Sequence, residues 1–283
     1  SMLTATGIVA ALVSVSPASA APEVQPHLAV HLRPDVRTNP SFVAGRDDTV
    51  VAIQQGLRVG VSGAWTNVSA RVDVQEVRTW GERAGSTSTE PAMHAYQGYI
   101  EADTGGGYLR VGRQEIHLFN GYFLSRAPFN PAGRSFDGIR WHGTDGPVQT
   151  DLFLTQLAAA RGWVDGASPA DLGDWFGGGQ ATWTDSEAFT PSLFVFAKAG
   201  GPTAAEPDRS DRWVGPGVRT TVKLDETVLE FDGLVQLGDD SGTPRRAYNV
   251  IARAEQGIRA PLDPGLAVRF DQSSGHACVG PAG

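Results

Sequence analysis

The sequence predicts an all-β protein, and three observations favour a transmembrane antiparallel up-and-down β-barrel within that class. Short runs of alternating apolar and polar residues recur along the 283-residue chain, which contains 35 Gly and 18 Pro. Several runs extend over about 12 residues, which exceeds the usual globular strand and suits a tilted membrane strand with its rim. Short turns and long loops alternate between the runs, as they do in bacterial outer-membrane barrels.

Composition narrows the class of protein further. The formal net charge is -8 and no basic cluster dominates any segment, which argues against nucleic-acid binding. The single cysteine, Cys278, excludes an internal disulfide framework and any multi-cysteine metal site.

The N-terminal segment has the pattern of a secretory signal peptide. Residues 3–15 are apolar, and the small residues SPASA follow them, although no basic residue precedes the run. We therefore predict a signal peptide at residues 1–20, cleaved after Ala20, and one outer-membrane β-barrel domain at residues 21–283. The alternative is a buried N-terminal helix, because the run is shorter than the roughly 20 residues that span a bilayer.

Period-two alternation predicts about 13 strands in succession. In order, the expected strands are residues 27–39, 49–63, 65–78, 93–103, 108–115, 133–141, 147–158, 178–185, 188–199, 214–224, 227–237, 247–258 and 265–271. We expect a very tight turn at Gly63-Ala64 and a loop at residues 239–246. The last residues, GHACVGPAG, have loop composition. Because single-chain bacterial barrels usually have an even strand number and close by pairing the last strand with the first, we expect the closing C-terminal strands to be missing from this sequence.

Two hairpins show the alternation most clearly. Val72 and Val74 share one face of the third expected strand and Asp73 lies on the other, while Phe231 and Asp232 alternate in the same way near the end of the chain. A charge inside a strand costs free energy unless its face is wet or the charge is paired. A soluble sandwich would turn the charged face outward and a barrel would turn it into the lumen, so the alternation alone fits both folds.

The stretch from residue 93 to residue 141 holds two strand patterns, a long loop and the start of a third strand. Arg113 and Glu115 are two residues apart, so we expect them to share a face and to pair. Val111 would lie on that same face, and Asp137 would share its face with Ile139. A β-bulge, or strand ends that leave the bilayer, would reconcile these charges with their apolar neighbours.

Arginines recur within the strand patterns. They are Arg58, Arg71, Arg78, Arg110, Arg113, Arg134, Arg140, Arg219, Arg253 and Arg269. Because a guanidinium recognises carboxylates through a planar fork, several of them around a pore would make a selective path for a polyanion. The alternatives are an ordinary exposed sheet face, or arginine and acid ladders that only brace a barrel.

Signals for catalysis or metal binding are weak. The sequence contains no GxSxG, HExxH or P-loop motif, and it offers no constellation for a barrel lipase. His27 and His31 would be about 13 Å apart along a strand, which is too far for a shared metal. Residues 239–242 (DDSG) could hold a calcium ion, but such a run is more often a plain turn. We therefore expect no enzyme, no catalytic residue, no metal and no cofactor.

Four blocks of sequence carry a resemblance to a known family. They are VDVQEVRTWGE at residues 72–82, HAYQGYIEAD at 94–103, VGRQE at 111–115 and GRSFDGIRW at 133–141. In this order and spacing they resemble the alginate-export family of outer-membrane porins, and the hairpin rhythm extends the likeness over most of the chain. The chain has Phe129-Asn130 where the family pattern leads us to expect a Trp-Asn pair.

The resemblance implies a barrel of about 18 antiparallel strands in the bacterial outer membrane, whose lumen passes an anionic exopolysaccharide outward by diffusion. Arginines that line the lumen would attract uronate carboxylates, and neighbouring acidic side chains would hold these arginines in place. The resemblance implies that Arg78, Arg113, Glu115, Arg134, Asp137 and Arg140 line the pore or its rim. From the strand patterns we add Arg71, Asp73 and Arg110 as further candidates for pore-lining residues.

The expected partners are an anionic polysaccharide or oligosaccharide, outer-membrane lipid and periplasmic secretion proteins, with no nucleic acid. The channel would export an alginate-like polymer or pass small anionic solutes. The alternative function is that of a secreted soluble β-sandwich that binds carbohydrate.

Overall fold

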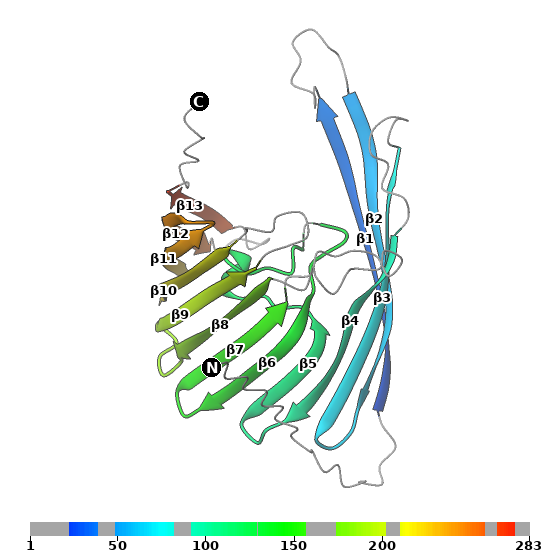
Figure 1. The fold of residues 1–283 in the computed structure, drawn as a ribbon, viewed down its shortest axis with the longest axis horizontal. Coiled ribbons are helices and arrows are strands. Elements are labelled where there is room, and N and C mark those ends of the chain that lie inside the picture. Colours follow the sequence, from blue (N-terminus) through cyan, green and yellow to red (C-terminus); the bar gives the residue numbers. More distant parts are fainter. Residues whose placement is uncertain are drawn as a thin grey trace, which may run out of the picture.

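A computed structural model describes residues 23–38, 49–81, 92–128, 130–156, 174–201, 210–257 and 265–274. The expected signal peptide and Cys278 lie outside these residues. Thirteen antiparallel strands form a single sheet whose spatial order follows the chain from β1 to β13 (Figure 1). The expected succession of about 13 strands is confirmed. A soluble β-sandwich would require two sheets packed face to face, whereas the described strands form one sheet.

The strands are longer than most globular strands. Their bounds are β1 Glu23–Thr38, β2 Thr49–Ala64, β3 Val68–Trp80, β4 Ala92–Asp103, β5 Gly107–Gln114, β6 Phe136–Asp145, β7 Val148–Gln156, β8 Trp175–Trp183, β9 Phe189–Gly200, β10 Asp211–Leu224, β11 Thr227–Asp240, β12 Thr243–Gly257 and β13 Gly265–Ser273. The sheet curves into a trough that is open between β1 and β13 (Figure 1), and in the described residues each of these edge strands pairs with one neighbour only.

The convex face of the sheet is apolar. The concave face is polar on β3 and on β10–β11, and it carries a cluster of buried phenylalanines on β7–β9. In β3, Val72 and Val74 are 53% and 42% exposed, whereas Asp73 and Gln75, which point the other way, are almost completely buried. The same alternation holds in β11, where Phe231 is exposed and Asp232 is buried. A large exposed apolar face is typical of strands that contact lipid. Among the described residues, no helix has the length and apolar character to cross a membrane.

Exposed aromatic residues mark both ends of the outer face. Trp80 and Trp175 lie at the ends of β3 and β8 that meet the long connections, and Trp65 and Trp183 lie at the short-turn end. Tryptophan is enriched at both membrane interfaces because its ring is apolar and its N–H is polar. The two levels therefore bound an apolar band across the sheet.

Two turns differ from those that the sequence predicts. The turn after β2 lies at Trp65–Asn67 rather than at Gly63-Ala64, because Ala64 still pairs with Ser69 in the ladder. The loop expected at residues 239–246 is wrong: Asp240 pairs with Thr243, and only Ser241 and Gly242 connect β11 to β12. Both connecting residues have positive φ (51° and 87°), as a two-residue hairpin turn of the primed type requires.

A β-bulge interrupts the pairing of β3 with β4. Asp73 pairs with Gln97 and Val74 pairs with Ala95, so Tyr96 is the extra residue. As a result Tyr96 and Gln97 are both buried although they are neighbours in sequence. Gly112 in β5 has a φ of 126°, and a Cβ there would come within 2.2 Å of the Gly98 carbonyl oxygen, so this position requires glycine.

Candidate functional site

The connection between β5 and β6 folds against the concave face of the sheet. We call residues 115–128 and 130–135 the inward loop. A backbone hydrogen bond from Leu118 N–H to the Leu124 carbonyl (3.0 Å) closes a small hairpin within it, and the short 3-10 helix Phe119–Gly121 forms its tip. The loop therefore narrows the space that the curved sheet surrounds (Figure 1).

An apolar side of the inward loop packs on β7, β8 and β9. Ile116, Leu118, Phe119 and Leu124 are buried there. The sheet residues of the same cluster are Phe136, Phe153, Phe176, Phe194 and Phe196. Burying several large apolar side chains fixes the loop, at roughly 1.5–3 kcal/mol for each fully buried side chain.

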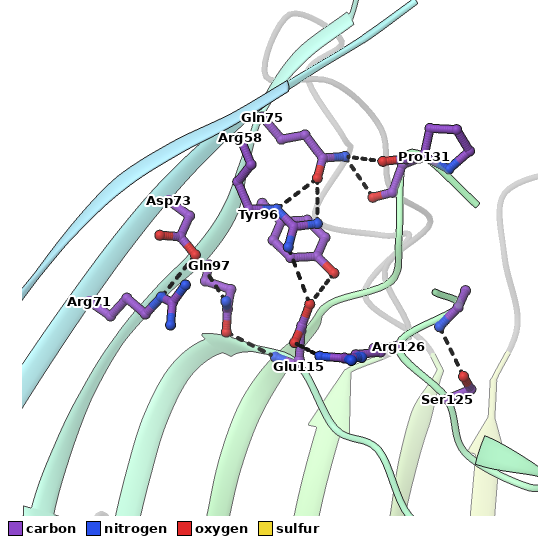
Figure 2. Close-up of polar contacts among 12 residues, drawn as sticks. Arg58, Arg71, Asp73, Gln75, Tyr96, Gln97, Glu115, Ser125, Arg126 and Pro131 are labelled. Atoms are coloured by element: carbon purple, nitrogen blue, oxygen red, sulfur yellow. Dashed lines mark hydrogen bonds and ion pairs between the residues drawn. The ribbon is translucent and has the colours of Figure 1, made fainter. Parts of the chain in front are cut away.

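A polar side of the inward loop is held by Glu115, the first residue after β5. The Tyr96 hydroxyl donates a hydrogen bond to Glu115 (2.5 Å), and Arg58 and Arg126 each lie 3.5 Å from its carboxylate (Figure 2). The Arg58 guanidinium carbon also lies 3.3 Å from the centroid of the Tyr96 ring. One carboxylate thus links the loop to β2 and to the bulge of β4.

The far end of the inward loop is held by Gln75 of β3. Its side-chain amide donates to the carbonyls of Ala132 (2.7 Å) and Pro131 (3.2 Å), and its carbonyl accepts two hydrogen bonds from Arg58 (Figure 2). Gln75 is 1% exposed, and a buried amide with all its groups bonded holds its neighbours in one arrangement. The loop is anchored at both ends and along its apolar side.

Four of the predicted site residues lie on the concave face. Arg71 Nε donates to Asp73 (2.9 Å), which also accepts from Gln97 (2.9 Å; Figure 2). Arg110 and Arg140 are opposite each other in the β5–β6 ladder, and each is held by an acid.

The partners of those two arginines come from neighbouring strands. Arg110 binds Glu101 at 2.5 Å, and Arg140 binds the buried Asp151 at 2.5 Å. The Arg110 guanidinium also lies over the ring of Tyr99, 4.2 Å from its centroid. The predicted Glu115 completes the inward-facing set through its contacts with Arg58 and Tyr96.

Three predicted residues share the outward face with exposed apolar side chains. Arg78 pairs with Glu76, and both alternate in step with Val74. Arg113 and Asp137 pair directly at 2.6 Å and lie in step with Val111 and Ile139 near the long-connection end of their strands.

The expected pairing of Arg113 with Glu115 is wrong, because β5 ends at Gln114 and Glu115 turns into the loop. The last predicted residue, Arg134, is an exposed side chain of the inward loop and forms no ion pair with another described residue. Whether any of these nine positions lines a pore remains a prediction.

A further charged cluster on β10–β12 was not among the predicted site residues. Arg219 binds Glu230 (2.6 Å) and Asp232 (3.3 Å), and Arg253 also binds Glu230 (3.1 Å). In the sequence, the alternation of acidic and apolar residues in β11 indicated that Glu230 and Asp232 lie on a polar face. The pairing of strands that brings Arg219 to these acids is visible only in the fold.

Two cavities border the inward loop. The larger, of about 540 Å³, lies between the loop and strands β1, β2 and β13, and its lining includes Arg33, His117, Tyr122 and Arg269. No carboxylate is part of that lining among the described residues. The smaller cavity, of about 230 Å³, is lined by Pro131 of the loop and by Arg58, Gln75, Tyr96 and Glu115.

The structure offers no evident metal site in the residues it describes, where no group of three His, Cys, Asp or Glu side chains lies together. Residues 239–242, which were considered for calcium binding, form a hairpin turn in which the Asp239 carboxylate accepts a hydrogen bond from the Gly242 N–H (2.9 Å). A plain turn is therefore the observed structure of this run.

One family model and several solved structures match the chain. A model described as "Alginate export" matches residues 27–279. No curated protein sequence matches.

The solved structures similar to this chain are outer-membrane proteins. OmpF of Salmonella typhi, solved with daunomycin, superposes with a TM-score of 0.60 at 10% identity over 92% of this chain and 81% of OmpF. The channel DcaP of Acinetobacter baumannii gives 0.50 at 12% identity over 89% and 79% of the two chains. OccK11 of Pseudomonas aeruginosa gives 0.50 at 12% identity over 89% of this chain and 63% of its own. At these identities the likeness shows a porin fold.

Proposed function

The chain belongs to the alginate-export family and is an outer-membrane channel, and from this premise we propose that it passes an anionic, uronate-rich polysaccharide through the concave side of its sheet. The polymer would move by diffusion along paired arginines, without a chemical step. Its carboxylates would exchange between guanidinium groups that protein acids hold in place.

The larger cavity is the observation that carries the proposal. It lies beside the inward loop, and among the described residues its lining includes Arg33, His117 and Arg269 but no carboxylate. Arg33 lies 3.9 Å from Asp35, which is not part of the lining. Arg269 is 45% exposed in its side chain even though it pairs with Asp271 at 2.5 Å. A cationic passage at a constriction raises the local concentration of an anion and lowers that of a cation.

The arginine and acid pairs on the concave face support movement rather than tight binding. Arg71, Arg110 and Arg140 each have an acid within 3 Å, so a passing carboxylate competes with an existing partner. Conduction requires that binding be strong enough to admit the solute and weak enough to release it. Paired arginines meet both conditions better than unpaired ones.

Single-channel recording in planar bilayers tests the proposal. We expect anion-preferring channels that uronate oligomers block and that neutral oligosaccharides of the same length block much less. The block should weaken between about 0.1 M and 1 M salt, as the Debye length falls from roughly 10 Å to 3 Å. Passage of small anions without uronate block would limit the function to that of a small-solute porin.

A matched pair of variants assigns the effect to the cavity. Arg269→Gln removes a cation that lines the cavity, whereas Arg113→Gln removes one on the outward face. We expect the first to reduce uronate block by about tenfold, which corresponds to about 1.4 kcal/mol, and the second to leave it unchanged. Equal block in all three proteins would contradict the proposal.

A further inference from the structure

Two arginines on the outward face of the sheet have no partner in the described part of the chain. Arg212 of β10 and Arg246 of β12 are exposed, and neither forms an ion pair with another described residue. Arg78 and Arg113 lie at the same end of the outward face but are neutralised by Glu76 and Asp137. Among the described outward residues at this rim, the arginines without an acid partner therefore lie on β10 and β12.

Strand register places the two arginines at neighbouring levels of the outward face. Arg212 is opposite Ala199, which is in turn opposite the exposed Trp175, so Arg212 lies level with an interfacial tryptophan. Arg246 is opposite Leu237, and Leu237 is opposite Val214, the next outward position after Arg212. The two guanidinium groups thus flank the same short segment of β11 at neighbouring levels.

The outward residues below Arg212 show that this level is the edge of the apolar band. From Val214 to Leu224, β10 turns Val218 and Val222 outward and carries no charge on that face until the strand ends. This length matches the roughly 9–11 residues with which a tilted strand crosses the hydrocarbon. An outward arginine is costly at the bilayer midplane and nearly neutral at the interface, so Arg212 lies where the headgroups begin.

Asp239 lies between the two arginines but does not neutralise them. Its position in β11 is opposite Arg212, yet its carboxylate accepts the Gly242 N–H in the turn at 2.9 Å and forms no ion pair with a described arginine. Two guanidinium groups and one carboxylate give these three described residues a net charge of about +1. A guanidinium in this setting binds phosphate through two parallel hydrogen bonds.

We propose that Arg212 and Arg246 form a binding site for the phosphate groups of a membrane glycolipid, on the outer face of β10–β12 at the long-connection end. Trp175 would cover the junction between acyl chains and headgroup, and Tyr248, which is 43% exposed one outward position below Arg246, would extend that contact. The site rests on the membrane location of the protein and is independent of what passes through the channel.

Native mass spectrometry of the detergent-purified protein tests the site. The probes are lipid A with two phosphates, the same lipid without phosphates, and inorganic phosphate as a competitor. At the same lipid concentration, we expect the phosphorylated lipid to occupy the protein at least about tenfold more than the dephosphorylated lipid does. Equal binding of the two lipids would overturn the proposal, and displacement by equimolar inorganic phosphate would assign the site to free anions instead of lipid.

Two double variants separate the site from general charge. Arg212→Gln with Arg246→Gln should lower lipid occupancy by about tenfold, whereas Arg78→Gln with Arg113→Gln should leave it unchanged. The same loss in both variants, or no loss in the first, would contradict the assignment. Each variant is first checked for the heat-dependent gel migration of the folded protein, and the comparison of lipids on the unmodified protein tests the site even if a variant does not fold.

Discussion

The ring of Phe119 lies 4.5 Å from the ring of Phe194, centroid to centroid, and joins the tip of the inward loop to β9 across the concave face. The two rings are inclined by 42°, and both are buried with Phe196 close to each. Offset and inclined aromatic pairs stabilise beyond the area they bury. This contact holds the tip of the loop against the concave face of the sheet.

Truncating Phe119 should therefore open the channel. Phe119→Ala removes a buried ring at a cost of about 3–5 kcal/mol, so the loop should leave its packed position part of the time. We expect a higher and noisier single-channel conductance. Phe231→Ala, which removes an exposed outward ring, serves as the control and should leave conductance unchanged. Identical conductance in both variants would show that the loop does not restrict the current.

Removing the charge of Glu115 should increase the preference for anions. Glu115→Gln keeps an acceptor for the Tyr96 hydroxyl but takes away the negative charge 3.5 Å from Arg58 and from Arg126. The reversal potential in a salt gradient should then shift towards that of the anion. Asp137→Asn, which removes an acid on the outward face, should produce no shift, and a shift of the same size there would refute the explanation.

Gly133 is expected to tolerate no side chain. Its φ is 63°, and a Cβ would come within 2.5 Å of the Tyr96 hydroxyl oxygen. Gly133→Ala combines backbone strain with a clash in the anchor, so the free energy of unfolding should fall by more than about 2 kcal/mol. Gly146 has a similar φ of 55° with open space around it, so Gly146→Ala should cost only the strain, about 1 kcal/mol. Denaturant unfolding in detergent measures both, and equal losses would remove the steric part of the argument.

Breaking the buried ion pairs of β10–β11 should destabilise the protein more than breaking an exposed pair. Arg219→Met leaves Asp232, with a fully buried side chain, without its cation, at a cost of about 3–5 kcal/mol. Arg269→Met removes the pair with Asp271, in which both side chains are more than 40% exposed, at a cost of about 0–1 kcal/mol. Urea unfolding should rank the two variants in this order, and the reverse order would count against the buried cluster as a structural element.

Much of the architecture follows from the sequence because strand period and membrane thickness are local properties. The alternation of Val72, Asp73 and Val74 fixes which residues share a face, and the long runs fix the strand length. The hairpin turn at Ser241-Gly242 was missed because its flanking residues, Asp239 to Arg246, have loop composition. Their pairing across the turn overrides that composition.

The candidate site was predictable in its residue types and only partly in its geometry. The sequence selected Arg71, Asp73, Arg110 and Arg140, which lie on the concave face with partners close by. It could not show that Arg113 turns to Asp137, because that contact depends on the register of β5 against β6, which places the two residues directly opposite each other.

By itself the sequence determined a succession of long strands, each with one apolar and one charged face, since those features repeat every two residues. The pairing of these strands into a single sheet came from the tertiary structure. Only the tertiary structure decided that the inward loop folds onto the concave face, because most of the phenylalanines that hold it come from strands farther along the chain. It also decided which arginines face the concave side and which, like Arg212 and Arg246, face outward. Such choices depend on cross-strand register and packing, which no local pattern encodes.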